Sequence, residues 1–202
     1  MRKIYLGASK LIKILMRVIW NYEVINIAGL KKAQSCLIAS NHLSWFDPPF
    51  IGAMTPFEIA YLAKSELFKY KFGSFILRLG NAIPVKRDQV DMNAISRVLK
   101  VLDSGKSLMI FPQGGINRKS IKPGVGLFAM KMKKDIIPVC VKNTDKPFSC
   151  LFRLKKTMIV VGEPIKYESF ADWELTRENF QKLANLVYER IIEMYQNIKE
   201  AS

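Results

Sequence analysis

The sequence contains little cysteine and no long apolar run, and each of these shortages excludes certain classes of protein. Three cysteines are present, and neither their odd number nor their spacing fits a disulfide framework or a metal site. We therefore expect a reducing, cytosolic compartment and assign no function to a cysteine. No stretch of about 18 or more apolar residues is free of charge, so the sequence does not require a transmembrane helix.

Acidic residues are also few. Aspartate and glutamate number 17 against 32 lysines and arginines, which gives a formal net charge of +15. Such an excess indicates an anionic partner: nucleic acid, an anionic membrane surface or a phosphorylated substrate. The 202 residues, half of them hydrophobic, are sufficient for one domain with a sizeable core.

The N-terminal segment has the pattern of an amphipathic helix. Its apolar residues recur at helical spacing and its cations fall mostly on the other side: Ile4, Ala8, Leu11, Ile12, Leu15 and Ile19 against Lys3, Lys10, Lys13 and Arg17. The pattern is typical of a helix lying in a membrane interface, and a helix packed on the domain with a solvated basic face explains it as well. We expect residues 1–22 to be a membrane-associating helix that precedes a single domain at 23–202.

The rest of the chain alternates short apolar runs with helical patterns. The runs predict strands at 35–40, 59–63, 82–85, 107–111, 136–141 and 158–161. Helical patterns begin at 50–54 and cover 72–79, 93–102, 125–133 and 176–199. This alternation predicts an α/β fold with a mostly parallel sheet flanked by helices.

Histidine occurs once, at position 42, directly after the first predicted strand. The ends of strands in open α/β sheets are where ligands bind. Asp47 follows five residues later, just before Pro48 and Pro49, and either caps the next helix, orients His42, or does both. A carboxylate on one imidazole nitrogen fixes the tautomer and leaves the other nitrogen to take a proton from a hydroxyl. A lone histidine and an Asp-Pro-Pro cap are, on their own, more often structural.

Four sequence blocks, in order and at similar spacing, resemble the motifs of the lysophosphatidic acid acyltransferase family, which comprises 1-acyl-sn-glycerol-3-phosphate acyltransferases and their relatives. Each block alone is a weak signal, and the four in order are a strong one. With Val161-Gly162-Glu163-Pro164-Ile165, which is similar to a late strand of the family, they span roughly residues 35–166. The blocks are Asn41-His42-x4-Asp47; Lys64–Phe68 followed by Gly80, Ala82–Val85 and Arg87; Phe111-Pro112-Gln113-Gly114; and Ile137-Pro138-Val139.

The resemblance implies a reaction and a set of roles. A fatty acyl group would move from acyl-CoA or acyl carrier protein to the hydroxyl of a lysophospholipid, above all 1-acylglycerol 3-phosphate, to give phosphatidic acid. His42 would be the general base and Asp47 would orient it, with no metal and no cofactor. Residues 23–202 would form the acyltransferase domain, at the cytoplasmic face of the cell membrane as a peripheral or monotopic protein. Substrate-binding roles fall on Asn41, Lys64, Arg87, Gln113, Gly114 and Arg118.

The third block departs from the family's usual Phe-Pro-Glu-Gly-Thr-Arg. Gln113 stands in place of Glu, Gly115 in place of Thr, and Ile116 in place of Arg. An amide keeps a hydrogen-bond acceptor, adds donors and loses the charge. Because Ile116 cannot bind phosphate, either Arg118 or Lys119 reaches into the site or the acceptor is a different lipid.

Two other functions would each explain part of the sequence. A nucleic-acid-binding protein also explains the charge, but we find no recognisable binding motif and expect no nucleic acid as a partner. A relative that binds lipid without transferring acyl groups would explain the altered third block, although His42 and Asp47 argue against it. The apolar face of the N-terminal helix would also be covered in a homodimer. The expected partners are an anionic membrane surface, a lysophospholipid acceptor and the acyl donor.

Overall fold

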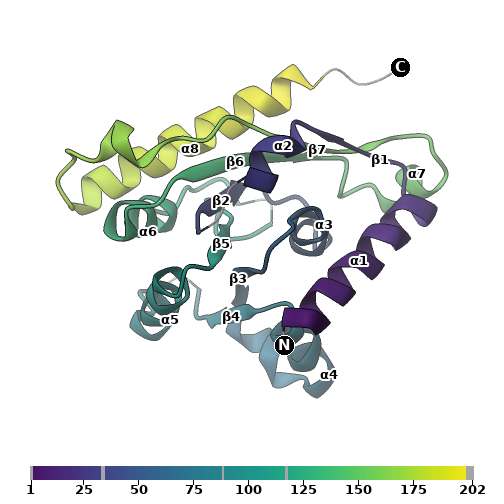
Figure 1. The fold of residues 1–202 in the computed structure, drawn as a ribbon, viewed down its shortest axis with the longest axis horizontal. Helices are drawn as coiled ribbons and strands as arrows, with labels where there is room; N and C mark the ends of the chain where they lie inside the picture. The colour runs from purple at the N-terminus through teal and green to yellow at the C-terminus, as the bar shows by residue number, and fades with distance from the viewer. Residues whose placement is uncertain (1, 33–34, 88, 117, 199–202) are drawn as a thin grey trace.

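A seven-stranded sheet forms the centre of the protein (Figure 1). The computed structural model describes residues 2–32, 35–87, 89–116 and 118–198. The strand order is β1-β7-β6-β2-β5-β3-β4, and every neighbouring pair is parallel except β6 with β7. The strands are β1 (Tyr22–Ile25), β2 (Leu37–Ser40), β3 (Ile59–Lys64), β4 (Ala82–Val85), β5 (Ser107–Ile110), β6 (Ile136–Lys142) and β7 (Thr157–Val161).

Helices cover both faces of the sheet. The described helices are α1 (Arg2–Ile19), α2 (Ile27–Lys32), α3 (Asp47–Met54), α4 (Lys71–Leu79), α5 (Met92–Asp103), α6 (Gly124–Met132), α7 (Pro147–Leu151) and α8 (Arg177–Asn197), with 3-10 turns η1 (Ser65–Lys69) and η2 (Tyr167–Phe170). Side chains of α5, α6 and α8 pack on one face, and those of α1, α2 and α3 on the other. The result is a three-layer α/β/α arrangement, so the predicted α/β fold is confirmed.

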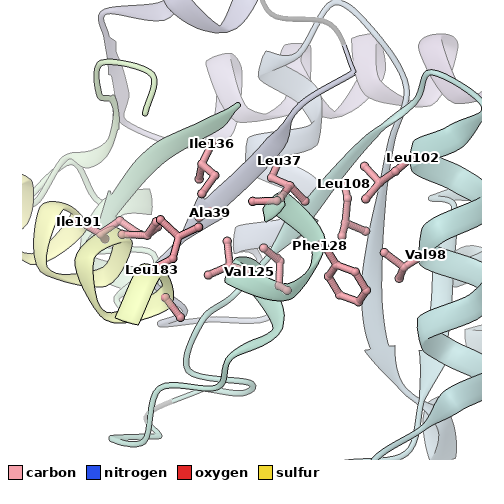
Figure 2. Close-up of a cluster of buried hydrophobic side chains, with 14 of the residues drawn as sticks. Leu37, Ala39, Val98, Leu102, Leu108, Val125, Phe128, Ile136, Leu183 and Ile191 are labelled. Carbon is pink, nitrogen blue, oxygen red and sulfur yellow. The ribbon is translucent and has the colours of Figure 1, made fainter. Parts of the chain in front are cut away.

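The central strands are buried on both sides, which explains their unbroken apolar runs. Leu37 and Ala39 of β2 face the cluster under α5, α6 and α8, whereas Ile38 between them faces α1 and α3. Figure 2 shows the first of these clusters, in which Phe128 of α6 and Leu183 of α8 lie among the strand residues. Each fully buried side chain of this size contributes about 1.5–3 kcal/mol to folding.

All six predicted strands are present, with ends within two residues of the expected ones. The predicted helices are present as well, although the expected end of the last one at Lys199 lies outside the described residues. The prediction missed β1 and the short helices α2 and α7. β1 is an edge strand whose four residues are only half-buried, so it carries no uninterrupted apolar run.

The N-terminal helix packs on the domain and also exposes an apolar stripe. Tyr5 and Met16 are buried in the cluster that α1 shares with α3. A second apolar row of α1 is exposed: Ile4, Leu11, Ile14 and Leu15. The side chains of Lys3 and Ile19 lie outside the described part of the chain. No helix among the described residues is long and apolar enough to cross a membrane.

The crossing of α6 and α8 requires a glycine. A Cβ on Gly126 would overlap the backbone carbonyl of Phe180, which cannot move aside as a flexible side chain can. We expect Gly126→Ala to lower the free energy of unfolding by about 3 kcal/mol, as measured by urea denaturation. Gly7→Ala is the matched control, because Gly7 also lies in a helix and its added Cβ would meet nothing within 4 Å. That variant should be neutral or stabilising by about 1 kcal/mol at most; equal losses in both variants would contradict the packing argument.

Candidate active site

The candidate site lies at the carboxyl edge of the parallel strands, near the middle of the sheet. β2 is flanked by β5 and β6, and the loop of residues 41–46 leaves it at this edge. The loop that follows β5 begins with Phe111 at the same edge. Crevices outside the carboxyl ends of strands are the usual ligand sites of open α/β sheets. Two blocks far apart in the sequence therefore meet here.

His42 and Asp47 form a hydrogen-bonded pair. Nδ1 of His42 lies 2.8 Å from Oδ2 of Asp47, and the carboxylate is fully buried. An ionised carboxylate can only accept a hydrogen bond, so Nδ1 carries the shared proton. In the neutral imidazole the lone pair is then on Nε2, and this nitrogen is the one able to accept a proton. The pair has the arrangement of a general base and its orienting group.

The same carboxylate oxygen organises the loop around it. The backbone N–H groups of Leu43 and Ser44 donate to Asp47 Oδ2 at 2.7 and 2.8 Å. Asp47 is the first residue of α3, and the helix has no side-chain cap at Phe46. Pro48 in the first turn has no N–H to satisfy. Of the alternatives left open by the sequence (capping, orientation of His42, or both), the described contacts include the bond to the His42 ring and no side-chain bond to the first turn of α3.

Phe111 is a site residue to which the sequence argument gave no role. Its ring stacks on the His42 imidazole, with centroids 4.0 Å apart and planes inclined by 18°. The stack holds one face of the ring while Asp47 holds its edge, so the imidazole has little freedom to turn. The only sequence signal for this contact is the position of Phe111 directly after a buried strand, in the third block.

Gln113 joins the histidine loop to the loop after β5. Its Oε1 accepts a hydrogen bond from the His42 backbone N–H at 3.0 Å, and its Nε2 donates to the Arg118 carbonyl at 2.8 Å. The side chain is buried. An ionised glutamate would keep the first bond and lose the second, because it has no donor. The departure from the family motif at this position thus has a structural use.

Two arginines converge on Gly115. A Cβ built on this glycine would lie 3.0 Å from Nη1 of Arg87 and 3.2 Å from Nε of Arg118. Gly114 before it has φ +68°, a conformation that favours glycine, and its N–H closes a turn with the Phe111 carbonyl at 2.8 Å. Arg118, two positions later than the arginine of the family motif, therefore lies with Arg87 above the same small residue.

The two remaining predicted residues lie at the same edge with other contacts. Asn41 binds the backbone of Val141 in β6 twice, through Nδ2 to the carbonyl and through Oδ1 from the N–H, both at 2.8 Å. These bonds fasten the start of the histidine loop to the neighbouring strand. Lys64 ends β3, two places from β2 in the sheet, and its Nζ lies 3.5 Å from Oε1 of Glu66.

All three cysteines are free thiols, and all three are buried. Burial raises the pKa of Cys140 to about 12 and also raises the pKa of Cys36 above its usual value. A thiol with such a pKa is not ionised at neutral pH, so neither residue supplies the thiolate that nucleophilic catalysis requires.

Comparisons with known proteins identify the family of the chain. The family model described as Acyltransferase matches residues 21–142, which is more than half of the chain. A 1-acyl-sn-glycerol-3-phosphate acyltransferase of Bacillus subtilis is 27% identical over 194 residues, covering 94% of this chain and 96% of the relative. A lyso-ornithine lipid O-acyltransferase of Pseudomonas aeruginosa is 29% identical over 91 residues, covering 45% of this chain and 34% of that protein.

A solved structure shares the fold. The 1-acyl-sn-glycerophosphate acyltransferase of Thermotoga maritima superposes with a TM-score of 0.74 at 20% identity, covering 97% of this chain and 81% of the other. The family model and the named relatives define an O-acyltransferase. The chain belongs to the acyltransferase family, in its lysophosphatidic acid acyltransferase group.

The two hydrogen bonds of the Gln113 side chain can be tested by restoring the glutamate that is usual in the family. We expect Gln113→Glu to lower the free energy of unfolding at pH 7 by about 1–3 kcal/mol, because the carboxylate leaves the Arg118 carbonyl facing an acceptor. Lowering the pH protonates the new carboxyl, returns one donor and should shrink the deficit. Gln196→Glu, at an exposed position of α8, is the control and should stay within about 0.5 kcal/mol of the parent. A Gln113→Glu protein as stable as the parent would refute the assignment.

Proposed function

We propose that this chain transfers a fatty acyl group from acyl-CoA or acyl carrier protein to the free hydroxyl of 1-acylglycerol 3-phosphate. The observation that carries the proposal is the buried His42–Asp47 pair, in which Nδ1 and Oδ2 lie 2.8 Å apart. It is accompanied by the two arginines that converge on Gly115. A base and a pair of cations at the same edge of the sheet suit a substrate that has both a hydroxyl and a phosphate.

His42 acts as the general base of this reaction. Its Nε2 takes the proton of the acceptor hydroxyl while the hydroxyl oxygen attacks the thioester carbonyl carbon. The tetrahedral intermediate collapses, the carbon–sulfur bond breaks, and the imidazolium returns its proton to the leaving thiolate. Asp47 holds the ring and stabilises the imidazolium that forms between the two steps. No acyl-enzyme is needed, because the acceptor is itself the nucleophile.

Arg87 and Arg118 bind the acceptor's phosphate. A guanidinium offers paired N–H donors that match phosphate oxygens, and two of them approach Gly115 from different loops. The absence of a side chain on Gly115 leaves room for them. Arg118 thereby supplies the cation that Ile116 cannot.

A different lysolipid acceptor is the second candidate. Gln113 and Ile116 alter the third block, and one relative is named as acting on a lyso-ornithine lipid. Such an acceptor would keep the chemistry of His42 and Asp47 and change only the group that the cations recognise.

Several further expectations belong to this proposal. Residues 1–22 associate with an anionic membrane surface through the exposed apolar row of α1, and residues 23–202 form the acyltransferase domain. The protein then works as a peripheral or monotopic enzyme at the cytoplasmic face. The reaction as written requires no metal and no cofactor, and this stays a prediction.

The first test measures acyl transfer with labelled acyl-CoA and acyl-carrier-protein donors across a panel of lysophosphatidic acid, other lysophospholipids and lyso-ornithine lipid. We expect phosphatidic acid as the main product and a loss of about 10³-fold in kcat for His42→Ala. Asp47→Asn keeps an oxygen for the Leu43 and Ser44 N–H groups but removes the charge, so it should stay folded and lose much of kcat. Turnover only on another acceptor would show that the substrate is a different lysolipid. Transfer that survives His42→Ala would refute the mechanism.

The arginine pair is tested by separating KM from kcat. We expect Arg87→Ala and Arg118→Ala each to raise KM for lysophosphatidic acid by about tenfold or more, since each removes a charge-assisted hydrogen bond worth about 1.5–3 kcal/mol. Gly115→Ala keeps both charges and displaces them, so it should raise KM as well. Arg97→Ala, on the exposed side of α5, is the control. An unchanged KM in the three site variants would show that the phosphate binds elsewhere.

A further inference from the structure

We propose that the segment of residues 146–156, which contains α7 and is called here the α7 segment, is a second membrane-contacting element. Together with α1 it would seat the active-site edge of the sheet on an anionic bilayer. The inference rests on the proposed function, because a lipid acceptor requires a bilayer at that edge. Its partner is the lipid surface itself and not another protein.

The reversal of one strand brings this segment to the active-site edge. β6 runs parallel to β2 and ends at Lys142, whereas β7 runs antiparallel to β6 and begins at Thr157. The connection between them therefore lies at the carboxyl edge of β2, where the loop of His42 begins. Asn41, next to His42, binds the backbone of Val141 near the end of β6.

The α7 segment displays large apolar side chains to solvent. Phe148, Phe152 and Leu154 are 74%, 70% and 79% exposed, and Leu151 is exposed as well. Single exposed apolar residues are ordinary, whereas four exposed within seven consecutive positions indicate an interaction site. The segment is held in shape from within, because the buried Cys150 accepts a hydrogen bond from Thr157 Oγ1 at 3.2 Å.

The charges of the segment suit an anionic surface. Residues 146–156 contain four cations and no acidic residue: Lys146, Arg153, Lys155 and Lys156. Lys156 pairs with Glu23 of β1 at 3.0 Å, and the others flank the apolar side chains along the chain. Phenylalanine and leucine beside lysine and arginine is the composition of interfacial membrane elements. Each cation near an anionic surface is worth about fivefold in affinity.

The segment is fastened to the end of α1. The indole N–H of Trp20, just past α1, donates to Thr157 Oγ1 at 3.0 Å, and the Asn21 N–H donates to the Cys150 carbonyl at 3.5 Å. Figure 1 shows α7 beside the C-terminal end of α1. The Trp20 ring also lies 5.1 Å from that of Phe46, in the loop that follows His42. The helix, the α7 segment and the histidine loop are thus linked by direct contacts.

A bilayer accounts for these features better than acyl carrier protein does. Both partners are anionic, so the cations do not choose between them. The apolar side chains do, because three of them are at least 70% exposed and would gain most by insertion among acyl chains. Trp45, which precedes Phe46 in the loop after His42, is also exposed, and tryptophan is enriched at membrane–water interfaces.

The experiment compares two multiple variants of the full chain for binding to vesicles. Phe148→Ser/Phe152→Ser/Leu154→Ser removes the apolar side chains of the α7 segment. Leu175→Ser/Leu186→Ser is the control, because it removes exposed leucines before and on α8, which covers the face of the sheet away from α1. Co-sedimentation with phosphatidylglycerol–phosphatidylcholine vesicles should fall about tenfold or more in the first variant and within about twofold in the second. Equal binding by the first variant and the parent would overturn the proposal.

Insertion is read directly by a fluorescent label. The three native cysteines are buried, so Phe152→Cys and Leu186→Cys each provide one accessible thiol for an environment-sensitive dye. We expect a blue shift with the anionic vesicles at position 152 only. A shift at neither position, or a shift at position 152 with acyl carrier protein in place of vesicles, would overturn the bilayer as the partner.

A soluble assay separates this proposal from the proposed function. With a short-chain acceptor kept below its micellar concentration, the apolar variant should retain the parent's kcat, because none of its substitutions touches the described site. If the parent acylates no acceptor, the proposed function fails while the vesicle and dye results still decide the membrane contact. If the apolar variant loses kcat in solution to the same extent as it loses vesicle binding, the segment supports the fold and the membrane proposal is overturned.

Discussion

One buried oxygen atom holds the active-site loop together. Asp47 Oδ2 accepts hydrogen bonds from the His42 ring and from the backbone N–H groups of Leu43 and Ser44, so the loop is wound around a single acceptor. A buried carboxylate is costly unless its hydrogen bonds are made. These three donors all bind Oδ2, whereas the buried Oδ1 has no hydrogen-bond partner among the described residues. The same contacts define where β2 stops and α3 begins. The orientation of the His42 ring and the local course of the chain therefore have one physical cause.

Around this centre the site is stiffened by residues that do not have to touch the substrate. Phe111 stacks on the imidazole, Asn41 ties the loop to β6, and Gln113 bridges the His42 N–H and the Arg118 carbonyl. Each of these contacts replaces the freedom of a loop with a bond to a neighbouring strand or loop. If His42 is the general base, as we propose, such preorganisation would help it to meet both substrates in one geometry.

Much of this architecture could be read from the sequence because burial leaves a direct trace in it. Central strands such as Leu37–Ser40 are covered on both faces and appear as apolar runs, and His42 follows one of them. β1 escaped detection because it is an edge strand of half-buried residues, and α7 escaped detection because its 5 residues are too few to show a helical period. The bond from Gln113 to Arg118 and the meeting of Arg87 with Arg118 depend on how two loops fold back. Spacing along the chain does not encode that, so the sequence left open whether Arg118, Lys119 or neither lies where the family motif has its arginine, and the structure places Arg118 beside Gly115.

The antiparallel orientation of β7 also determines which edge of the sheet carries the connection through α7. By returning antiparallel, β7 sends the connection through α7 to the edge that already holds His42, and leaves connections such as Ser104–Lys106 and Lys133–Asp135 at the other. Those turns are short and carry no group of the candidate site. Insertions and fused domains should therefore be tolerated better at that edge than at the edge that holds the candidate site.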